Sequence, residues 1–404
     1  MICAPRLLRW VRAMDKISLT NKIKVFAEEC GLDLLGITGP EAFQDYIGRL
    51  SPIAHMYEPG YTKDRVEKWS RMAQPREVMP EARSVIVAGF YYLTGDSMDM
   101  TAPGVPCGSV ARVLTHGHAG VYKRIVKLAE FLAQQGFQVK GGIHRKSAAV
   151  RAGLGFIGKN TLVNNEQFGS WVAYQVLVTD AELEFDAPCA LDGCEGCRAC
   201  MDACPTKALY EPYKLDPRRC ITYLLNQEII PAEFRQKLGN RILGCDICQE
   251  ACPRNKGLTP KRNVESVMSE KIGLSPSLLT LLSMNEETFR SEVLAKIGEK
   301  FSQTSGTFIE EMVPNTFQKA GGKMLVYMRN VILALGNIAD PAAVPYLIKA
   351  LGFPVPLIRA QAAWSLGKIG TPQSKEALEK ALSSEVDGEV RAEMAAAIEH
   401  RGEI

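Results

Sequence analysis

The stretch that decides the fold is CEGCRACMDACP, residues Cys194–Pro205, together with GCDICQEACP, residues Gly244–Pro253. The first run spaces its cysteines as C-x2-C-x2-C-x3-C-P. The second run repeats the form as C-x2-C-x3-C-P, with its leading cysteine displaced to Cys220. Two residues between cysteines let one tight loop place three thiolates at the corners of a cube, while the cysteine before proline points away from it.

This spacing predicts two [4Fe–4S] clusters, because the cysteine before each proline ligates the other cluster. We expect one cluster on Cys194, Cys197, Cys200 and Cys252, and the other on Cys204, Cys220, Cys245 and Cys248. Zinc is the alternative, but its sites normally take two cysteine pairs rather than triplets followed by Cys-Pro. Disulfides fit less well, because no export signal is evident and reduced cysteines suit the cytosol.

Length and composition set broad limits. A chain of 404 residues predicts two or three domains, and a net charge of +3 neither requires nor excludes a nucleic-acid partner. No apolar run reaches the length of a membrane span. The first fourteen residues are basic but lack the apolar core of a signal peptide, so they read as a flexible extension, or else Met14 is the start. We expect a monomeric cytoplasmic protein.

The residues before the cysteines alternate between helical and extended patterns. Apolar periodicity predicts helices over 18–31 and 121–135, and β-branched runs predict strands over 84–89 and 171–178. This alternation predicts an α/β or α+β domain over roughly residues 15–185. The cluster module would then span about 186–262, and a helical domain about 263–404.

An internal repeat marks the C-terminal part. LGNIADPAAVPYLIKAL (Leu335–Leu351) recurs as LGKIGTPQSKEALEKAL (Leu366–Leu382) with a period of 31 residues. Such helix–turn–helix units resemble HEAT repeats. We expect Arg329 and Arg359 to precede the first helix of each copy. Two copies cannot form a stable solenoid alone, so they should pack on the rest of the chain, either as a structural unit or as a partner surface.

Read together, AGLGFIGKN (Ala152–Asn160), FGSW (Phe168–Trp171), the cysteine runs and the repeats resemble the epoxyqueuosine reductase family. The resemblance extends from about Ser18 to His400. It implies an α+β fold: an N-terminal α/β domain that holds cobalamin, a ferredoxin-like module with two [4Fe–4S] clusters, and HEAT-like helical repeats. Family members reduce epoxyqueuosine in a tRNA anticodon to queuosine. Cobalamin rests on the resemblance alone, because no D-x-H-x-x-G corrinoid signature is present.

The same resemblance implies cobalamin contacts at particular positions. Arg71, Val163 and Tyr174 match family contacts, as do Thr222, where a serine is usual, and Asp246 between Cys245 and Cys248. Core packing is the alternative explanation for Val163 and Tyr174.

One segment departs from the family. Its pattern V-D-[ST]-[GA]-x-x-x-[DE]-[RK] carries an aspartate at the reaction centre. Here VKGGIHRK (Val139–Lys146) is one residue shorter and has no carboxylate. Because the alkoxide leaving an epoxide needs a proton, His144 or Lys140 would have to supply it, or the substrate differs.

A second altered segment, RVLTHGHAGVY (Arg112–Tyr122), adds His116 and His118 to the side chains that should face the cofactor. Either a loop has drifted or the pocket has been rebuilt around histidines, which donate protons near neutral pH.

The resulting hypothesis is a cobalamin-dependent iron–sulfur reductase that receives electrons from an external donor such as a ferredoxin or flavodoxin. The alternatives are a reductase for another substrate and an electron-transfer protein that reduces another corrinoid protein. Basic residues that either track the phosphates of tRNA or form a solvated face are Arg218, Arg219, Arg235, Lys237, Arg241, Arg254, Lys256, Lys261 and Arg262.

Overall fold

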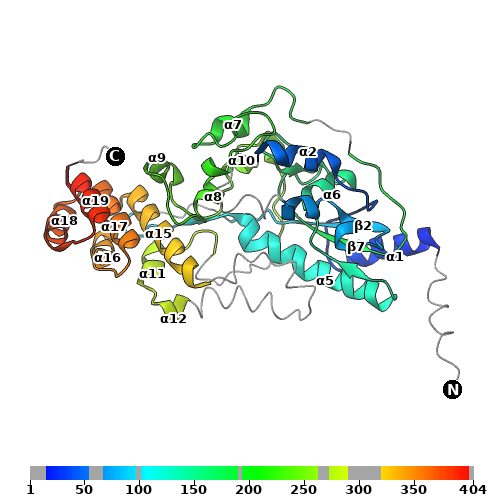
Figure 1. Ribbon diagram of the computed structural model, residues 1–404, viewed down its shortest axis with the longest axis horizontal. Coiled ribbons are helices and arrows are strands. Elements are labelled where there is room, and N and C mark those ends of the chain that lie inside the picture. Colours follow the sequence, from blue (N-terminus) through cyan, green and yellow to red (C-terminus); the bar gives the residue numbers. More distant parts are fainter. Residues whose placement is uncertain are drawn as a thin grey trace, which may run out of the picture.

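The computed structural model describes residues 15–53, 67–96, 102–189, 193–262, 273–289 and 320–399. A sheet domain lies at one end and the C-terminal helices at the other, with the cysteine-rich segment against both (Figure 1). Residues 1–14, predicted as an extension, lie outside the described part of the chain.

The central sheet has the strand order β1-β2-β7-β4, formed by β1 (Leu34–Thr38), β2 (Ser84–Tyr91), β7 (Val172–Thr179) and β4 (Val139–Lys140). All three pairings are antiparallel. Helices therefore alternate with strands in sequence without producing a parallel sheet, and the predicted α+β class is confirmed.

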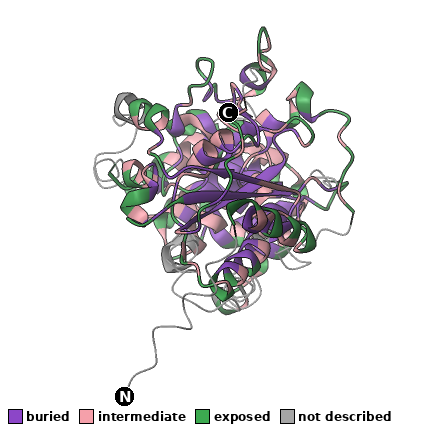
Figure 2. Cartoon of the chain, turned by 90° about the vertical axis from the view of Figure 1, so that its right-hand side faces the viewer, coloured by how far each residue is buried: buried purple, intermediate pink, exposed green. Residues whose placement is uncertain are grey.

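Helices cover both faces of this sheet, and Figure 2 shows its buried strands crossing the centre of the domain. All eight residues of β2 are buried, and side chains alternate between faces because a strand has a period of two. Ile86, Ala88 and Phe90 share a core with α1 (Lys16–Glu29) and α5 (His118–Gln134). Val85 and Val87 share another with α6 (Arg145–Arg151).

The helix predicted over 121–135 begins earlier, at His118, directly after a π-helical turn over Val113–Gly117. Such turns are rare and occur often at functional sites. Smaller elements of this domain are α2 (Gln44–Ile53), α4 (Pro75–Val78) and the hairpin of β5 (Phe156–Ile157) with β6 (Val163–Asn164).

The cysteine-rich segment consists of short helices that follow its cysteine loops: α7 (Ala199–Ala203), α8 (Ile221–Leu224), α9 (Ala232–Arg235) and α10 (Ile247–Glu250). Its strand β8 (Arg241–Leu243) pairs in parallel with β3 (Ser109–Val110). This pairing joins the segment to the sheet domain.

The C-terminal helices are α15 (Ala320–Ile338), α16 (Val344–Ala350), α17 (Pro356–Ile369), α18 (Pro372–Ser384) and α19 (Gly388–Glu399), preceded by α11 (Leu278–Ser283) and α12 (Glu286–Phe289). Their core includes Val110 and Ile242, so the repeats pack on the rest of the chain as predicted. One prediction is wrong: Arg329 and Arg359 lie inside α15 and α17, because these helices begin before the repeated motif.

Within the described residues, no helix has the length and apolar character needed to cross a membrane.

Candidate functional site

The cysteines form two groups. Burial raises the pKa of the Cys200 thiol, and the charges of Cys252, Cys194 and Cys197 raise it further. Cys252 likewise experiences Cys194 and Cys197. These four are the residues expected on one cluster, and the Cys-Pro cysteine of the second run therefore approaches the loop of the first.

The other four cysteines form the second group. Burial raises the pKa of Cys245 to about 11, with Cys220 contributing, and Cys204 contributes to the raised pKa of Cys220. Burial also raises the pKa of Cys248, together with Cys245 and Cys220. Cys248 also experiences Cys200, so the two groups adjoin there. Thiolates crowded in this way need nearby positive charge, such as cluster iron, to remain ionised.

Across the described ranges, no group of three or more His, Cys, Asp or Glu side chains is arranged to hold a single metal ion.

Asp246 ties the second cysteine group to the turn before α5. Its carboxylate is 2% exposed and accepts hydrogen bonds from the Arg112 amide at 2.8 Å and from Gln249 Nε2 at 3.1 Å. Burial raises its pKa to about 6. The Arg112 side chain reaches Glu250 at 3.1 Å and lies over the ring of Trp171.

Gln249 extends this contact into a buried polar network. Its Oε1 accepts hydrogen bonds from Tyr92 at 3.3 Å and Ser170 at 3.1 Å. Asn255 donates to Ser170 Oγ at 2.8 Å and accepts from the Ser170 amide at 2.8 Å. The network therefore links the FGSW segment to the residues after the second Cys-Pro, so two sequence motifs act as one structural unit.

Three predicted site residues lie along one edge of the sheet domain. The His144 amide donates to the carbonyl of Met72 at 2.7 Å, next to the exposed Arg71, and Lys140 Nζ donates to the carbonyl of Val78 at 3.4 Å. The ring of His144 caps α6 by accepting from the Ser147 amide, and it stacks on Tyr46 with 3.6 Å between centroids. Burial and the charges of Lys146 and Arg145 lower its pKa to about 3, so the imidazole is neutral at pH 7.

The remaining predicted contacts are dispersed. Val163 and Tyr174 are buried in the same apolar core as Ile143, and Tyr174 also donates a hydrogen bond to the carbonyl of Leu154 at 3.3 Å. Thr222 is exposed in the first turn of α8, where it hydrogen-bonds Cys220. Of the five cobalamin contacts that the resemblance implied, Thr222 and Asp246 lie beside the second cysteine group.

The chain is similar to known proteins over most of its length. Residues 193–255 match the family model of the 4Fe-4S double cluster binding domain, and residues 327–399 match that of HEAT repeats. Epoxyqueuosine reductase of Bacillus subtilis (strain 168) is 32% identical over 404 residues, which cover 96% of this chain and 97% of the relative.

The chain belongs to the epoxyqueuosine reductase family.

Solved structures agree with this membership. One is the Bacillus subtilis epoxyqueuosine reductase with its catalytic loop swung out of the active site. Another is an epoxyqueuosine reductase with an epoxyqueuosine-modified tRNA-Tyr stem loop. Each matches with a TM-score of 0.79 at 30% identity, over 94% of this chain and 98% of the other. The resemblance, the oxidoreductase class, the double cluster domain and the HEAT repeats inferred from the sequence are confirmed.

The epoxyqueuosine reductase resemblance did not identify Lys146, which the structure places beside the second cysteine group. Lys146 Nζ donates to the carbonyl of Thr161 at 2.8 Å. Burial lowers the pKa of its ammonium, and the thiolates of Cys248 and Cys220 oppose that shift. The sequence feature that could have identified Lys146 is its position two residues after His144, in the segment that departs from the family pattern.

The altered segment Arg112–Tyr122 contributes two further histidines. His116 is buried, with Nδ1 2.7 Å from Thr115 Oγ1, and burial lowers its pKa. Burial and the charge of Arg145 lower the pKa of His118 to about 4. Both imidazoles are therefore neutral at pH 7.

Proposed function

We propose that this protein is a cobalamin-dependent iron–sulfur reductase that reduces epoxyqueuosine to queuosine in tRNA. The observation that carries the proposal is the meeting of the second cysteine group with the altered segments: Lys146 experiences both Cys220 and Cys248, and Asp246 bonds the turn before α5. A cluster held by these cysteines would supply electrons beside the residues that would surround a substrate.

The side chains at this place support a corrinoid as the proposed cofactor. His118, Arg145 and Lys146 remain partly exposed, yet burial lowers the pKa of each. Their polar groups are suited to hydrogen-bond the amide and phosphate groups of cobalamin. When bound, cobalamin would supply a strongly reducing metal centre. Thr222 and Asp246 would hold it on the cluster side, and Arg71, Val163 and Tyr174 are the further proposed contacts.

The chain's own residues would handle electrons and protons. Removal of an epoxide oxygen as water takes up two electrons and two protons. We assign electron entry to the first cysteine group, because its loop exposes Glu195, Gly196 and Arg198 to a docking donor such as a ferredoxin or flavodoxin. We assign proton delivery to Lys140, or to His144, which would first have to take up a proton because its imidazole is neutral at pH 7. The protein would act as a cytoplasmic monomer.

Two variants separate these proton donors. His144→Asn keeps a side chain that can cap α6, because asparagine is a strong N-cap residue. Lys140→Met removes the ammonium but keeps the apolar stem. If His144 delivers the proton, only His144→Asn loses turnover while cluster content and melting temperature stay at wild-type values. If Lys140 does, only Lys140→Met loses turnover.

The tRNA partner draws support from a subset of the basic residues. Arg235 pairs with Glu393 at 2.8 Å, Arg218 with Asp216 at 2.9 Å and Lys261 with Asp33 at 2.7 Å. These charges are already engaged. Lys237, Lys256 and Arg262 are exposed and are the better candidates for phosphate contacts.

The deciding experiment measures the nucleoside in tRNA. Reconstituted protein, cobalamin and a chemical reductant are incubated without oxygen with tRNA from cells that accumulate epoxyqueuosine, and nucleosides are quantified by mass spectrometry. Conversion to queuosine is expected. Unchanged epoxyqueuosine, with clusters and cobalamin bound, would overturn the proposal.

A second function has one observation in its favour. Because the described Val139–Lys146 segment contains no carboxylate, the protein could instead reduce another substrate through the same cofactors. An electron-transfer protein acting on another corrinoid protein would bind no cobalamin itself, so the visible spectrum after adding cobalamin separates that alternative.

A further inference from the structure

Two basic side chains hold the loop that carries the first cysteines. Lys159 Nζ donates a hydrogen bond to the carbonyl of Cys197 at 2.9 Å. Arg254 Nε donates to the carbonyl of Gly193, directly before Cys194, also at 2.9 Å. The loop between these two points is tight, because the Cys197 amide bonds the carbonyl of Cys194 at 3.2 Å. The two cations therefore bond the beginning and the middle of one cysteine loop.

The sequence fixes the position of Arg254, which follows the second Cys-Pro. A Cβ at Gly193 would overlap the Arg254 guanidinium, so glycine at this position lets the charge approach the loop backbone. The guanidinium also lies over the ring of Phe156, 5.1 Å from the ring centroid. Phe156 is buried in the AGLGFIGKN motif, so a fixed ring positions the cation.

Lys159 belongs to the same motif, three residues after Phe156. Its carbonyl accepts from the Tyr213 amide at 3.3 Å, so its backbone and its side chain both bond the cysteine-rich segment. The side chain is partly buried, and solvent screens such a charge less than an exposed one. Lys207 gives a comparison, because it donates to the carbonyl of Asp202 at 2.8 Å but is exposed.

The charge of these donors has a consequence beyond holding the loop. A neutral donor is enough to satisfy a backbone carbonyl, whereas Lys159 and Arg254 each bring a positive charge. A [4Fe–4S] cluster gains one negative charge when it is reduced, and its potential depends on the charge around it. Positive charge at the loop stabilises the reduced form more than the oxidised form.

We propose that Lys159 and Arg254 are positioning residues that raise the reduction potential of the cluster expected on the first cysteine group. In this step the donor loses one electron and the cluster gains it, and no bond to the protein forms or breaks. A raised potential favours transfer from the donor to this cluster. The inference rests on the proposed function for the place of electron entry.

The test is a redox titration of the reconstituted protein, without tRNA or cobalamin, monitored by electron paramagnetic resonance. The titration step that is absent from Cys200→Ser belongs to the first cysteine group. In Lys159→Gln this step should shift, so that the ratio of reduced to oxidised cluster at a given potential falls about tenfold, equivalent to about 59 mV for one electron. Lys159→Arg should keep the wild-type potential, and the exposed control Lys207→Gln should change neither step.

Arg254→Gln should shift the same step in the same direction, and it replaces Lys159→Gln if that variant loses iron. Unchanged potentials in both variants, a shift confined to the other step, or an equal shift in Lys207→Gln would overturn the proposal. Loss of the cluster from both variants would overturn it too, because the two residues would then be structural supports. The titration uses no substrate, so its failure leaves the proposed function intact. Unchanged epoxyqueuosine beside a shifted potential would reject the proposed function alone.

Discussion

The backbone amide of Arg112 donates a 2.8 Å hydrogen bond to Oδ2 of Asp246, across 134 residues of sequence. Oδ1 of the same carboxylate accepts from Gln249 at 3.1 Å. One buried side chain thus fixes the loop between Cys245 and Cys248 against the turn that begins α5.

Replacement of Asp246 should loosen this junction. Asp246→Ala leaves two buried donors without their acceptor, and each such loss costs about 1–3 kcal/mol. We expect a lower melting temperature and faster loss of iron on exposure to oxygen. Asp246→Asn keeps one carbonyl oxygen and should lose less. The prediction fails if Asp246→Ala melts and releases iron as the wild type does.

The two cysteine groups predict separable clusters. Cys200→Ser and Cys220→Ser should each lower the iron content from about eight atoms per chain to about four, because each removes a ligand of one cubane. Cys107→Ser is the control, since Cys107 is buried outside both groups. Iron analysis and electron paramagnetic resonance of the reduced proteins provide the measurement. Loss of all iron in both variants would show that the clusters do not assemble independently.

The spacing of the cysteines was sufficient to predict the double cluster domain. That inference worked because the motif is local in the sequence, whereas the assignment of the eight cysteines to two clusters stays a prediction. Strands β2 and β7 were equally predictable from the sequence, because eight buried residues in a row leave a β-branched, apolar run.

The character of the altered segments was not predictable. His144 became a neutral capping residue through its position before α6 and its contact with Tyr46, and neither is visible in the sequence. Lys146 lies beside the thiolates of Cys220 and Cys248, which come much later in the sequence. Val163 and Tyr174 lie in a core whose extent depends on how α6 packs against the sheet.

A buried arginine connects the repeats to the cluster module. Arg329 in α15 is fully buried, and Nη1 donates to the carbonyl of Glu228 at 2.8 Å while Nη2 donates to that of Leu225 at 3.3 Å. Burial lowers its pKa to about 10. These carbonyls follow α8, the helix after Cys220.

Arg329→Met should therefore destabilise the protein by about 2 kcal/mol or more, because the carbonyls lose their donors, and should make the second cluster more labile. Arg329→Lys should be intermediate, since one ammonium cannot reproduce the fork. Arg76→Met is an exposed control. Chelator-induced iron loss and thermal melts are the measurements. A variant equal to the control in both would contradict the structural role of Arg329.

Gly155, within the AGLGFIGKN motif, has a φ of +150°, and a Cβ there would lie 2.3 Å from the backbone oxygen of Asn164. Gly155→Ala should thus disrupt the β5–β6 hairpin, with a cost of about 3 kcal/mol or more. Gly142 has a φ of +91° but open space around its Cβ position, so Gly142→Ala tests backbone strain alone. We expect a much smaller drop in melting temperature for Gly142→Ala, and equal drops would rule out the steric explanation.

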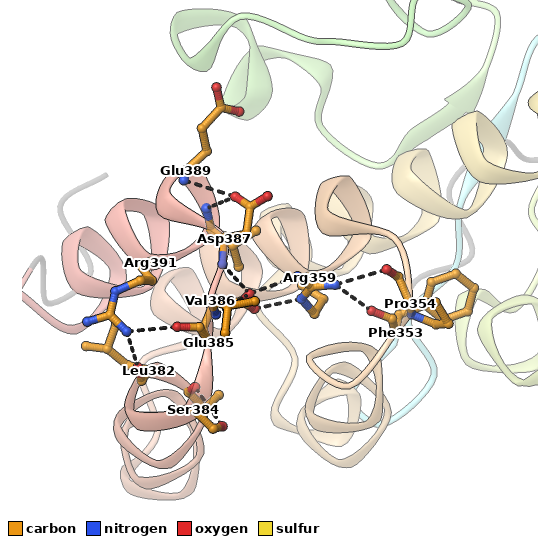
Figure 3. Close-up of polar contacts among 12 residues, drawn as sticks. Phe353, Pro354, Arg359, Leu382, Ser384, Glu385, Val386, Asp387, Glu389 and Arg391 are labelled. Atoms are coloured by element: carbon orange, nitrogen blue, oxygen red, sulfur yellow. Dashed lines mark hydrogen bonds and ion pairs between the residues drawn. The ribbon is translucent and has the colours of Figure 1, made fainter.

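Glu385 should give the repeats a defined acid sensitivity. Its carboxylate accepts from Arg359 Nε at 2.6 Å and Nη2 at 2.8 Å, and from the Val386 and Asp387 amides (Figure 3). The hydrogen bond from Arg359 lowers its pKa from 4.5 to about 2. Because the folded-state pKa of this acid is lowered, its stabilisation is complete above the unfolded-state pKa and is lost as the pH falls from about 4.5 towards 2.

Glu385→Gln should lower the stability of the protein by about 1 kcal/mol at pH 7. Cluster loss in acid affects both proteins alike, so the informative quantity is the difference in melting temperature between wild type and variant. This difference should stay constant from pH 7 to about 5 and shrink below that, because protonation then removes in the wild type what the substitution has already removed. A difference that does not change with pH would contradict the assignment to Glu385.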